Sequence, residues 1–247
     1  MLMRARHPVG QRVRRHRVSR HRRLARSRTP TQRMRPGKER DDRTRLARAH
    51  EFDVPVSIVV ERFGETYITL RDPDNMAVEL VASGPAGGHA LSRFHAVTLT
   101  QGHLAPTAKI LTELLNFTIV EERANRTRFA SAGPGFVDVE VLPDQRRGSI
   151  GAGIVHHIAF RTPTDEAQQE WHSKISEAGL SVSPIMDRNY FHSIYFREPG
   201  GVLFEIATDR PGFSVDEPAG ELGLHLKLPK WYEPRREELE AVLPALS

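Results

Sequence analysis

The residues best suited to chemistry are two adjacent histidines, His156 and His157, and one glutamate further along the chain, Glu205. An imidazole and a carboxylate both bind first-row transition metals, and a site that leaves coordination positions open suits non-haem Fe(II). The chain has no cysteine, which excludes disulfides, thiolate metal sites and a cysteine nucleophile. Any bound metal must therefore be held by His, Asp or Glu.

Both His157 and Glu205 lie in short apolar runs that are typical of β-strands. Side chains alternate between the two faces of a strand. Alternation over residues 155–161 and 202–208 places His157 and Glu205 on the faces opposite the bulkier apolar side chains. If the bulky faces pack on helices, His157 and Glu205 point together into the interior of a barrel formed by the predicted strands. The alternative is a hydrogen-bonded His and Glu pair inside a structural core.

The strand that carries Glu205 is one copy of a repeat. Residues 71–82 match residues 197–208 without a gap, and residues 133–142 form a looser copy. Each copy has a turn built on Pro and Asn or Gly, followed by a short apolar strand. The strand glutamates of the three copies are Glu79, Glu140 and Glu205. We interpret the first two as structural relics of duplication because neither has a matching histidine.

The opening strands repeat at the same interval, at residues 94–100 and 155–161. In the earlier copy His95 aligns with His156, but Ala96 stands at the position of His157. A helical apolar spacing follows each opening strand, at 105–115 and at 165–178. Two or three strands then complete each unit, so the pattern predicts repeated βαβββ modules and an α+β fold.

Counting back by the same period puts the opening strand of the first visible module near residue 30, where the sequence is rich in Pro and Arg and cannot form a buried strand. We therefore expect the first module to be incomplete. The predicted organisation is an Arg-rich extension at 1–45, a partial module at 46–88, a module at 89–150, a metal-bearing module at 151–216, and a C-terminal segment with a short helix at 217–247.

The basic N-terminal segment has its own composition. Residues 1–40 hold fifteen Lys or Arg and one acidic residue, so the remaining 207 residues carry a formal net charge of about −9 against +5 for the whole chain. With so few large hydrophobes, this segment is predicted to be disordered. A nonspecific nucleic-acid-binding tail and a transit peptide are alternatives, but we favour an upstream extension without evolved function.

The sequence also lacks the signals of membrane insertion and secretion. No run of about 18 apolar residues occurs, and the N-terminus has no apolar core of the signal-peptide kind. We therefore expect a cytoplasmic protein with no membrane partner and no specific nucleic-acid partner.

The repeated βαβββ unit, with His in its first strand and Glu in its last, resembles the vicinal-oxygen-chelate superfamily, which includes glyoxalases, bleomycin resistance proteins and extradiol dioxygenases. Residues 155–160, 186–191 and 197–205 look like the last module of ring-cleaving dioxygenases that act on hydroquinones. The resemblance covers about residues 46–247. That family has four modules, which implies that about one and a half are absent here.

The resemblance implies Fe(II)- and O2-dependent cleavage of a hydroquinone- or catechol-like ring, as in the degradation of aromatic compounds. It implies His157 and Glu205 as metal ligands, with Mn(II) or Zn(II) as alternative metals. His156, Arg188 and Tyr195 match residues that exchange protons with substrate, stabilise its anion and hydrogen-bond a phenolic oxygen. Each of these three also has an ordinary structural alternative, as a strand-start cap, a surface charge or a strand aromatic.

Two rival functions remain at this point. A glyoxalase-like lyase or isomerase would keep a metal but use glutamates from two modules. A metal-free protein of the same fold would bind and sequester an aromatic molecule. In the resembling family a second histidine ligand comes from the opening strand of the first module, which this sequence lacks. Truncation is therefore expected to leave negligible ring cleavage and to favour a homodimer or aggregation.

Overall fold

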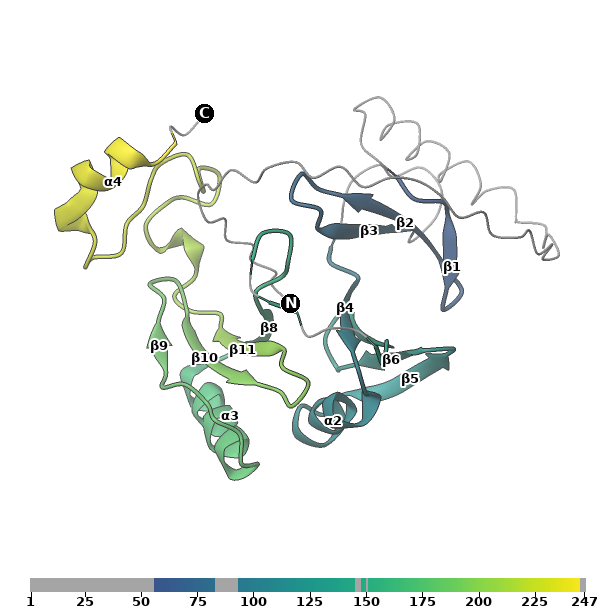
Figure 1. Ribbon diagram of the computed structural model, residues 1–247. Helices are drawn as coiled ribbons and strands as arrows, with labels where there is room; N and C mark the ends of the chain where they lie inside the picture. Colours follow the sequence, from purple (N-terminus) through teal and green to yellow (C-terminus); the bar gives the residue numbers. More distant parts are fainter. Residues whose placement is uncertain (1–55, 83–92, 145–147, 150, 245–247) are drawn as a thin grey trace. The chain divides into compact units, whose positions relative to one another are not determined.

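The computed structural model describes residues 56–82, 93–144, 148–149 and 151–244 (Figure 1). The extension expected at 1–45 therefore lies outside the described residues, as does the start of the partial module. The described chain divides into a smaller unit with residues 56–82, 93–95, 148–149 and 151–154, and a larger unit with residues 96–144 and 155–244.

The smaller unit contains a three-stranded antiparallel sheet in the order β1-β2-β3. Its strands are β1 (Val60–Arg62), β2 (Glu65–Arg71) and β3 (Ala77–Val81). A tight turn at Phe63 and Gly64, both with positive φ, joins the first two strands. Glu79 lies on β3 opposite Thr69, in the strand position predicted from the repeat.

The larger unit contains two modules of βαβββ order. The first, which we call the 96–141 module, consists of β4 (Ala96–Gln101), α2 (Leu104–Lys109), a π-helical turn (Ile110–Leu114), β5 (Thr118–Arg123), β6 (Arg126–Ala130) and β7 (Phe136–Val141). Its sheet has the order β4-β7-β6-β5, with β4 parallel to β7 and the other pairs antiparallel.

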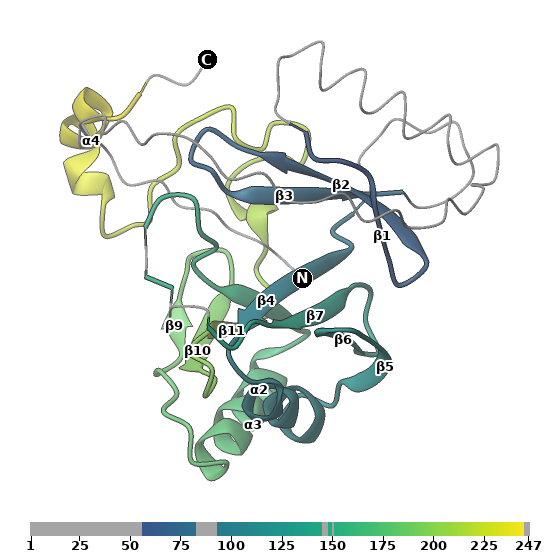
Figure 2. The same cartoon turned by 45° about the vertical axis from the view of Figure 1, so that its right-hand side comes forward.

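The second, which we call the 158–208 module, repeats this arrangement. It consists of β8 (Ile158–Thr162), α3 (Asp165–Glu177), β9 (Met186–Asp187), β10 (His192–Arg197) and β11 (Leu203–Thr208). The sheet order is β8-β11-β10-β9, and β8 runs parallel to β11. Helix α3 lies beneath this sheet (Figures 1 and 2). The α+β fold of repeated βαβββ modules that the sequence predicts is therefore confirmed.

Helix α3 begins at a side-chain cap and ends at a glycine. The side chain of Thr164 accepts a hydrogen bond from the backbone N–H of Ala167, which satisfies one of the unpaired donors of the first turn. The helix stops before Gly179, which has a φ of 77°. Both ends agree with the helix predicted over residues 165–178.

The two modules share one hydrophobic core. Strand residues of the 96–141 module, such as Phe129 and Val139, and of the 158–208 module, such as Phe204 and Ile206, belong to a single buried cluster. Between the modules, the Phe117 ring packs edge-on against Phe160, with ring centroids 5.7 Å apart. Because Phe204 and Ile206 point into this core, Glu205 faces the other side of the sheet.

The opening strands are shorter than the sequence predicts. Strands β4 and β8 begin at Ala96 and Ile158, so His156 and His157 lie in the segment that leads into β8 rather than within the strand. After β11 the chain forms two 3-10 turns (Phe213–Val215 and Glu233–Arg235) and the short helix α4 (Arg236–Val242), as expected for the C-terminal segment. No helix among the described residues has the length and apolar character needed to cross a lipid bilayer.

Candidate metal centre

His157 and Glu205 converge at the parallel pair β8 and β11. Nε2 of His157 lies 2.6 Å from Oε2 of Glu205, and the two side chains are 13% and 3% exposed. Glu205 stands opposite Ala159 in the strand register. His157 immediately precedes the first residue of β8, and its imidazole contacts the Glu205 carboxylate from that position. The two side chains therefore lie on the same side of the sheet.

The neighbouring strand β10 supplies two hydroxyl groups to the same carboxylate. Tyr195 lies directly opposite Glu205 in the antiparallel register and donates from its phenol oxygen to Oε1 at 2.9 Å. Ser193, two residues earlier on the same face, donates its hydroxyl to Oε1 as well. Glu205 therefore has one oxygen bound by two hydroxyl groups and one oxygen that faces an imidazole.

These contacts change the ionisation of the site. Burial alone would raise the pKa of Glu205, but the hydrogen bonds from His157, Ser193 and Tyr195 together outweigh it and lower the pKa, so the carboxylate is ionised near neutral pH. Burial raises the pKa of the Tyr195 phenol, and the negative charge of Glu205 adds to this effect. Tyr195 is therefore a protonated hydrogen-bond donor near neutral pH.

His156 and Arg188 complete the group of residues singled out in the sequence. The Nδ1 atoms of His156 and His157 lie 2.9 Å apart, and their rings meet edge-on. The guanidinium of Arg188 lies 5.4 Å from the centre of the Tyr195 ring. All five predicted site residues thus lie together in the structure. Their roles in metal binding and catalysis stay predictions.

A pocket opens beside the His157 and Glu205 pair, with a volume of about 180 Å³. Its floor continues along β8 and β11 through two small side chains, Ala159 and Ala207, and its walls are aromatic. The lining residues include Tyr190, Phe191 and Phe213. The Tyr190 and Phe213 rings are stacked with centroids 5.0 Å apart. The pocket is therefore largely apolar, and its polar lining includes His157 and Glu205 together with Thr208 and Asp209.

The donor set fits part of a metal site. His157 Nε2 and Glu205 Oε2 are the nitrogen and oxygen donors that suit non-haem Fe(II), and the adjoining pocket leaves room for exchangeable ligands. Within the described ranges, no group of three or more His, Cys, Asp or Glu side chains is placed to hold a metal ion. The described residues thus include two candidate ligands, one fewer than a facial triad requires.

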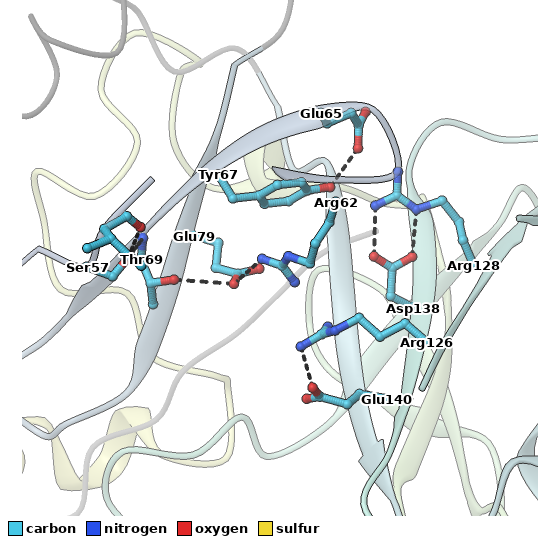
Figure 3. Close-up of polar contacts among 11 residues, drawn as sticks. Ser57, Arg62, Glu65, Tyr67, Thr69, Glu79, Arg126, Arg128, Asp138 and Glu140 are labelled. Carbon is cyan, nitrogen blue, oxygen red and sulfur yellow. Dashed lines mark hydrogen bonds and ion pairs between the residues drawn. The ribbon is translucent and has the colours of Figure 1, made fainter. Parts of the chain in front are cut away.

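The 96–141 module lacks this arrangement. In its parallel register Asp138 lies opposite Thr98, which aligns with Ala159, so Asp138 occupies the position of Glu205. The sequence repeat predicts Glu140 at this position, and that prediction is wrong by two residues because spacing along the chain does not fix the register between strands. Asp138 forms a bidentate ion pair with Arg128, with both contacts at 2.8 Å (Figure 3).

Glu140 and Glu79 are likewise paired with arginines. Glu140 lies 2.7 Å from Arg126 on β6. In the smaller unit, Glu79 forms an ion pair with Arg62 and also accepts a hydrogen bond from Thr69 (Figure 3). Guanidinium partners satisfy these carboxylates without a metal, in agreement with their interpretation as structural residues.

His95 has a different environment from His157. Its Nε2 lies 2.9 Å from Oε2 of Glu65, which also accepts a hydrogen bond from the hydroxyl of Tyr67 at 2.6 Å. These three residues belong to the smaller unit. The interpretation of His95 as a histidine outside the candidate metal site stays a prediction.

Sequence reasoning missed two features of the site. Ser193 was not singled out, although the alternation along residues 192–197 puts it on the same face as Tyr195 and could have identified it. The wall formed by Phe213 comes from the segment after β11 and carries no local pattern that links it to Glu205.

Comparisons with known proteins identify the family of this chain. Residues 93–206 match the profile of the "Glyoxalase/Bleomycin resistance protein/Dioxygenase superfamily". The chain is 38% identical over 206 residues to "Putative ring-cleaving dioxygenase MhqO" of Bacillus subtilis, covering 78% of this chain and 65% of that protein. It is 32% identical over 207 residues to "Chlorohydroquinone/hydroquinone 1,2-dioxygenase" of Sphingobium indicum, covering 75% of this chain and 64% of that protein.

A solved structure is also similar to this chain in sequence and in fold. A crystal structure titled as a "putative dioxygenase" from Bacillus subtilis superimposes with a TM-score of 0.77 at 37% sequence identity, over 84% of this chain and 70% of that one. The curated relatives described above are longer, and this chain spans about two thirds of their length. By profile, sequence identity and fold, the chain belongs to the glyoxalase, bleomycin resistance protein and dioxygenase superfamily.

Proposed function

We propose that this chain forms the substrate pocket and provides two metal ligands of an Fe(II)-dependent, extradiol-type ring-cleaving dioxygenase, which acts on a hydroquinone- or catechol-like aromatic and O2. The observation that carries the proposal is the His157 and Glu205 pair, which lines a largely apolar pocket with several aromatic residues. The Tyr195 phenol is hydrogen-bonded to Glu205, and the Arg188 guanidinium lies near the Tyr195 ring.

The metal and the protein divide the chemistry between them. Bound at His157 and Glu205, Fe(II) would supply Lewis-acid and redox chemistry toward the phenolic oxygens and O2. Tyr195 would hydrogen-bond a phenolic oxygen of the substrate, since its phenol stays protonated. Arg188 would stabilise the substrate anion through its positive charge. His156 is exposed beside His157, where it would take up or release a substrate proton.

The choice of substrate rests on relatives and on the pocket. One relative is named "Chlorohydroquinone/hydroquinone 1,2-dioxygenase", and another "Putative ring-cleaving dioxygenase MhqO". The stacked rings of Tyr190 and Phe213 offer apolar surface to one aromatic ring, and His157 and Glu205 line the same pocket. In this proposal the third metal ligand comes from outside the described residues.

A metal-free, aromatic-binding protein is the second candidate. The observation that favours it is the absence of a three-ligand group among the described residues. A glyoxalase-like lyase has less support, because the carboxylate of the neighbouring module at the Glu205 position, Asp138, is engaged by Arg128.

Metal analysis of variants tests the proposal. Purified protein is reconstituted with Fe(II) without oxygen, and bound iron is measured for wild type and for His157→Ala, Glu205→Ala and His95→Ala. We expect both site variants to lose the iron and His95→Ala to retain it. Equal loss from all three variants would show that iron binds elsewhere. Wild type that binds a hydroquinone without any metal would favour the second candidate.

A further inference from the structure

Ser193 is a completely buried hydroxyl at the candidate metal centre, with an exposed fraction of 0%. It lies on β10 next to Ile194, a residue of the hydrophobic core. Burial of a hydroxyl is unfavourable unless it is hydrogen-bonded. The hydroxyl of Ser193 meets this requirement by donating to Oε1 of Glu205. Ser193 therefore hydrogen-bonds to the Glu205 carboxylate rather than to solvent.

The two oxygens of Glu205 are not equivalent. Oε1 accepts hydrogen bonds from Ser193 and Tyr195, whereas Oε2 faces Nε2 of His157. A carboxylate oxygen has two lone-pair directions, so Oε1 can accept both hydroxyl hydrogen bonds at once. Rotation of the carboxylate about its terminal bond would break both of these hydrogen bonds.

Ser193 and Tyr195 differ in how freely they can leave Oε1. Tyr195 is half-buried, and the proposed function assigns its hydroxyl to the substrate. Ser193 has no exposed surface, and its strand pairs with β9 on one side and β11 on the other. When the phenol of Tyr195 turns toward a bound ligand, Ser193 is the donor that remains on Oε1.

We propose that Ser193 is a positioning residue that fixes the rotation of the Glu205 carboxylate, so that Oε2 alone is presented with His157 to a divalent metal ion. This inference rests on the proposed metal-binding role of His157 and Glu205. Hydrogen bonds to a ligating carboxylate orient it, and loss of such a bond typically lowers metal affinity by about 10- to 100-fold.

The test compares Ser193→Ala with Thr162→Val. Thr162 is also a buried hydroxyl of the same sheet, 1% exposed, and its oxygen has no hydrogen-bond partner among the residues that the structure describes. Fe(II) affinity is measured without oxygen by competition with a chromophoric chelator, and the thermal midpoint of each metal-free protein is recorded. We expect Ser193→Ala to weaken Fe(II) binding by about 10- to 100-fold and Thr162→Val to leave it unchanged.

Two further variants keep the test decisive. Ser193→Cys preserves the side-chain shape with a weaker donor, and should give an intermediate affinity even if Ser193→Ala folds poorly. In Tyr195→Phe, where one donor is already absent, Ser193→Ala should lower the Fe(II) affinity further than it does in wild type. A purely structural role would lower the thermal midpoint without changing the Fe(II) affinity of the folded protein.

The negative outcomes are distinguishable. Wild-type Fe(II) affinity in both Ser193 variants would overturn the positioning role while leaving the metal site in place. Failure of wild type itself to bind Fe(II) would overturn the proposed metal site and the positioning role together.

Discussion

Asp138 and Glu205 stand at the same register position of consecutive modules, but Asp138 is paired with a guanidinium and Glu205 with an imidazole. The partner of Asp138, Arg128, lies opposite it on β6 just as Tyr195 lies opposite Glu205 on β10. One fold position thus carries a closed ion pair in one module and a candidate metal ligand in the other.

The first prediction concerns this ion pair. Arg128 and Asp138 are 4% and 3% exposed, so Arg128→Met would leave a carboxylate buried without its partner. Breaking a buried pair in this way costs about 3–5 kcal/mol of unfolding free energy. Urea denaturation measures this loss.

A double replacement is the control for the Arg128 and Asp138 pair. Arg128→Met combined with Asp138→Leu removes both charges, and most of the lost stability should return because no buried charge remains unpaired. Bound Fe(II) should be unchanged in both proteins. Loss of metal from either variant would contradict the assignment of this module as purely structural.

The second prediction concerns Glu198, a buried carboxylate in the turn between β10 and β11. It accepts hydrogen bonds from the backbone N–H groups of Gly200 and Val202, and from the hydroxyl of Thr107 in the other module at 2.8 Å. Glu198→Ala leaves these donors unpaired, and we expect a loss on the order of 3 kcal/mol in unfolding free energy. The same change at the exposed Glu177 should have little effect on the unfolding free energy. Equal losses of stability in the two variants would argue against a stabilising link between the modules through Glu198.

The sequence predicted the local parts of this structure well. Alternation along β11 correctly separates Phe204 and Ile206, which pack in the core, from Glu205, because a period of two is a strong signal where one face is buried. The helix over residues 165–178 was also predicted correctly, since Thr164 and Gly179 are local start and stop signals.

The parts that failed depend on tertiary pairing. The position of Asp138 follows from its parallel register with β4, which joins residues far apart in the sequence. The hydrogen bonds of Ser193 and Tyr195 to a single oxygen likewise depend on the antiparallel register of β10 and β11. Alternation along residues 192–197 places Ser193 on the same face as Tyr195, but no spacing within one segment shows which residue lies opposite on the next strand. The polar surroundings of Glu205 are therefore only partly predictable.

The third prediction tests the cap of helix α3. Thr164→Ala removes the side-chain oxygen that accepts from the backbone N–H of Ala167. The expected loss is about 1 kcal/mol in unfolding free energy. Thr164→Ser keeps the oxygen and should retain most of the stability. If both variants lose the same amount, the methyl group rather than the cap is responsible.

The fourth prediction is a pH dependence. Burial raises the pKa of Tyr190, and its hydrogen bond to Asp216 at 2.9 Å and the charge of Asp216 raise it further. Both effects disfavour the phenolate, so Tyr190 should ionise at higher pH than a free tyrosine. Asp216→Asn removes the charge and should lower this pKa, leaving the contribution from burial. The tyrosinate absorbance of each protein, compared with Tyr190→Phe, follows this titration, and an unchanged pKa in Asp216→Asn would contradict the assigned cause.

The last prediction tests whether the pocket beside His157 and Glu205 receives the aromatic ring. Ala207 lies two residues beyond Glu205 on the same face of β11 and lines this pocket of about 180 Å³. In Ala207→Leu the larger side chain would project into the space between the strand and the stacked Tyr190 and Phe213 rings. Hydroquinone affinity, measured by calorimetry without oxygen on Fe(II)-loaded protein, should fall by about tenfold or more, which corresponds to about 1.4 kcal/mol.

Bound Fe(II) should stay the same in Ala207→Leu, because the substitution leaves His157 and Glu205 intact. Ala241→Leu, the same change at an exposed position of α4, is the matched control and should alter neither measurement. Loss of metal together with hydroquinone would mean that the leucine has displaced the ligands. Wild-type hydroquinone affinity in Ala207→Leu would place the aromatic ring outside this pocket. The substrate would then have to bind at a different surface around Glu205.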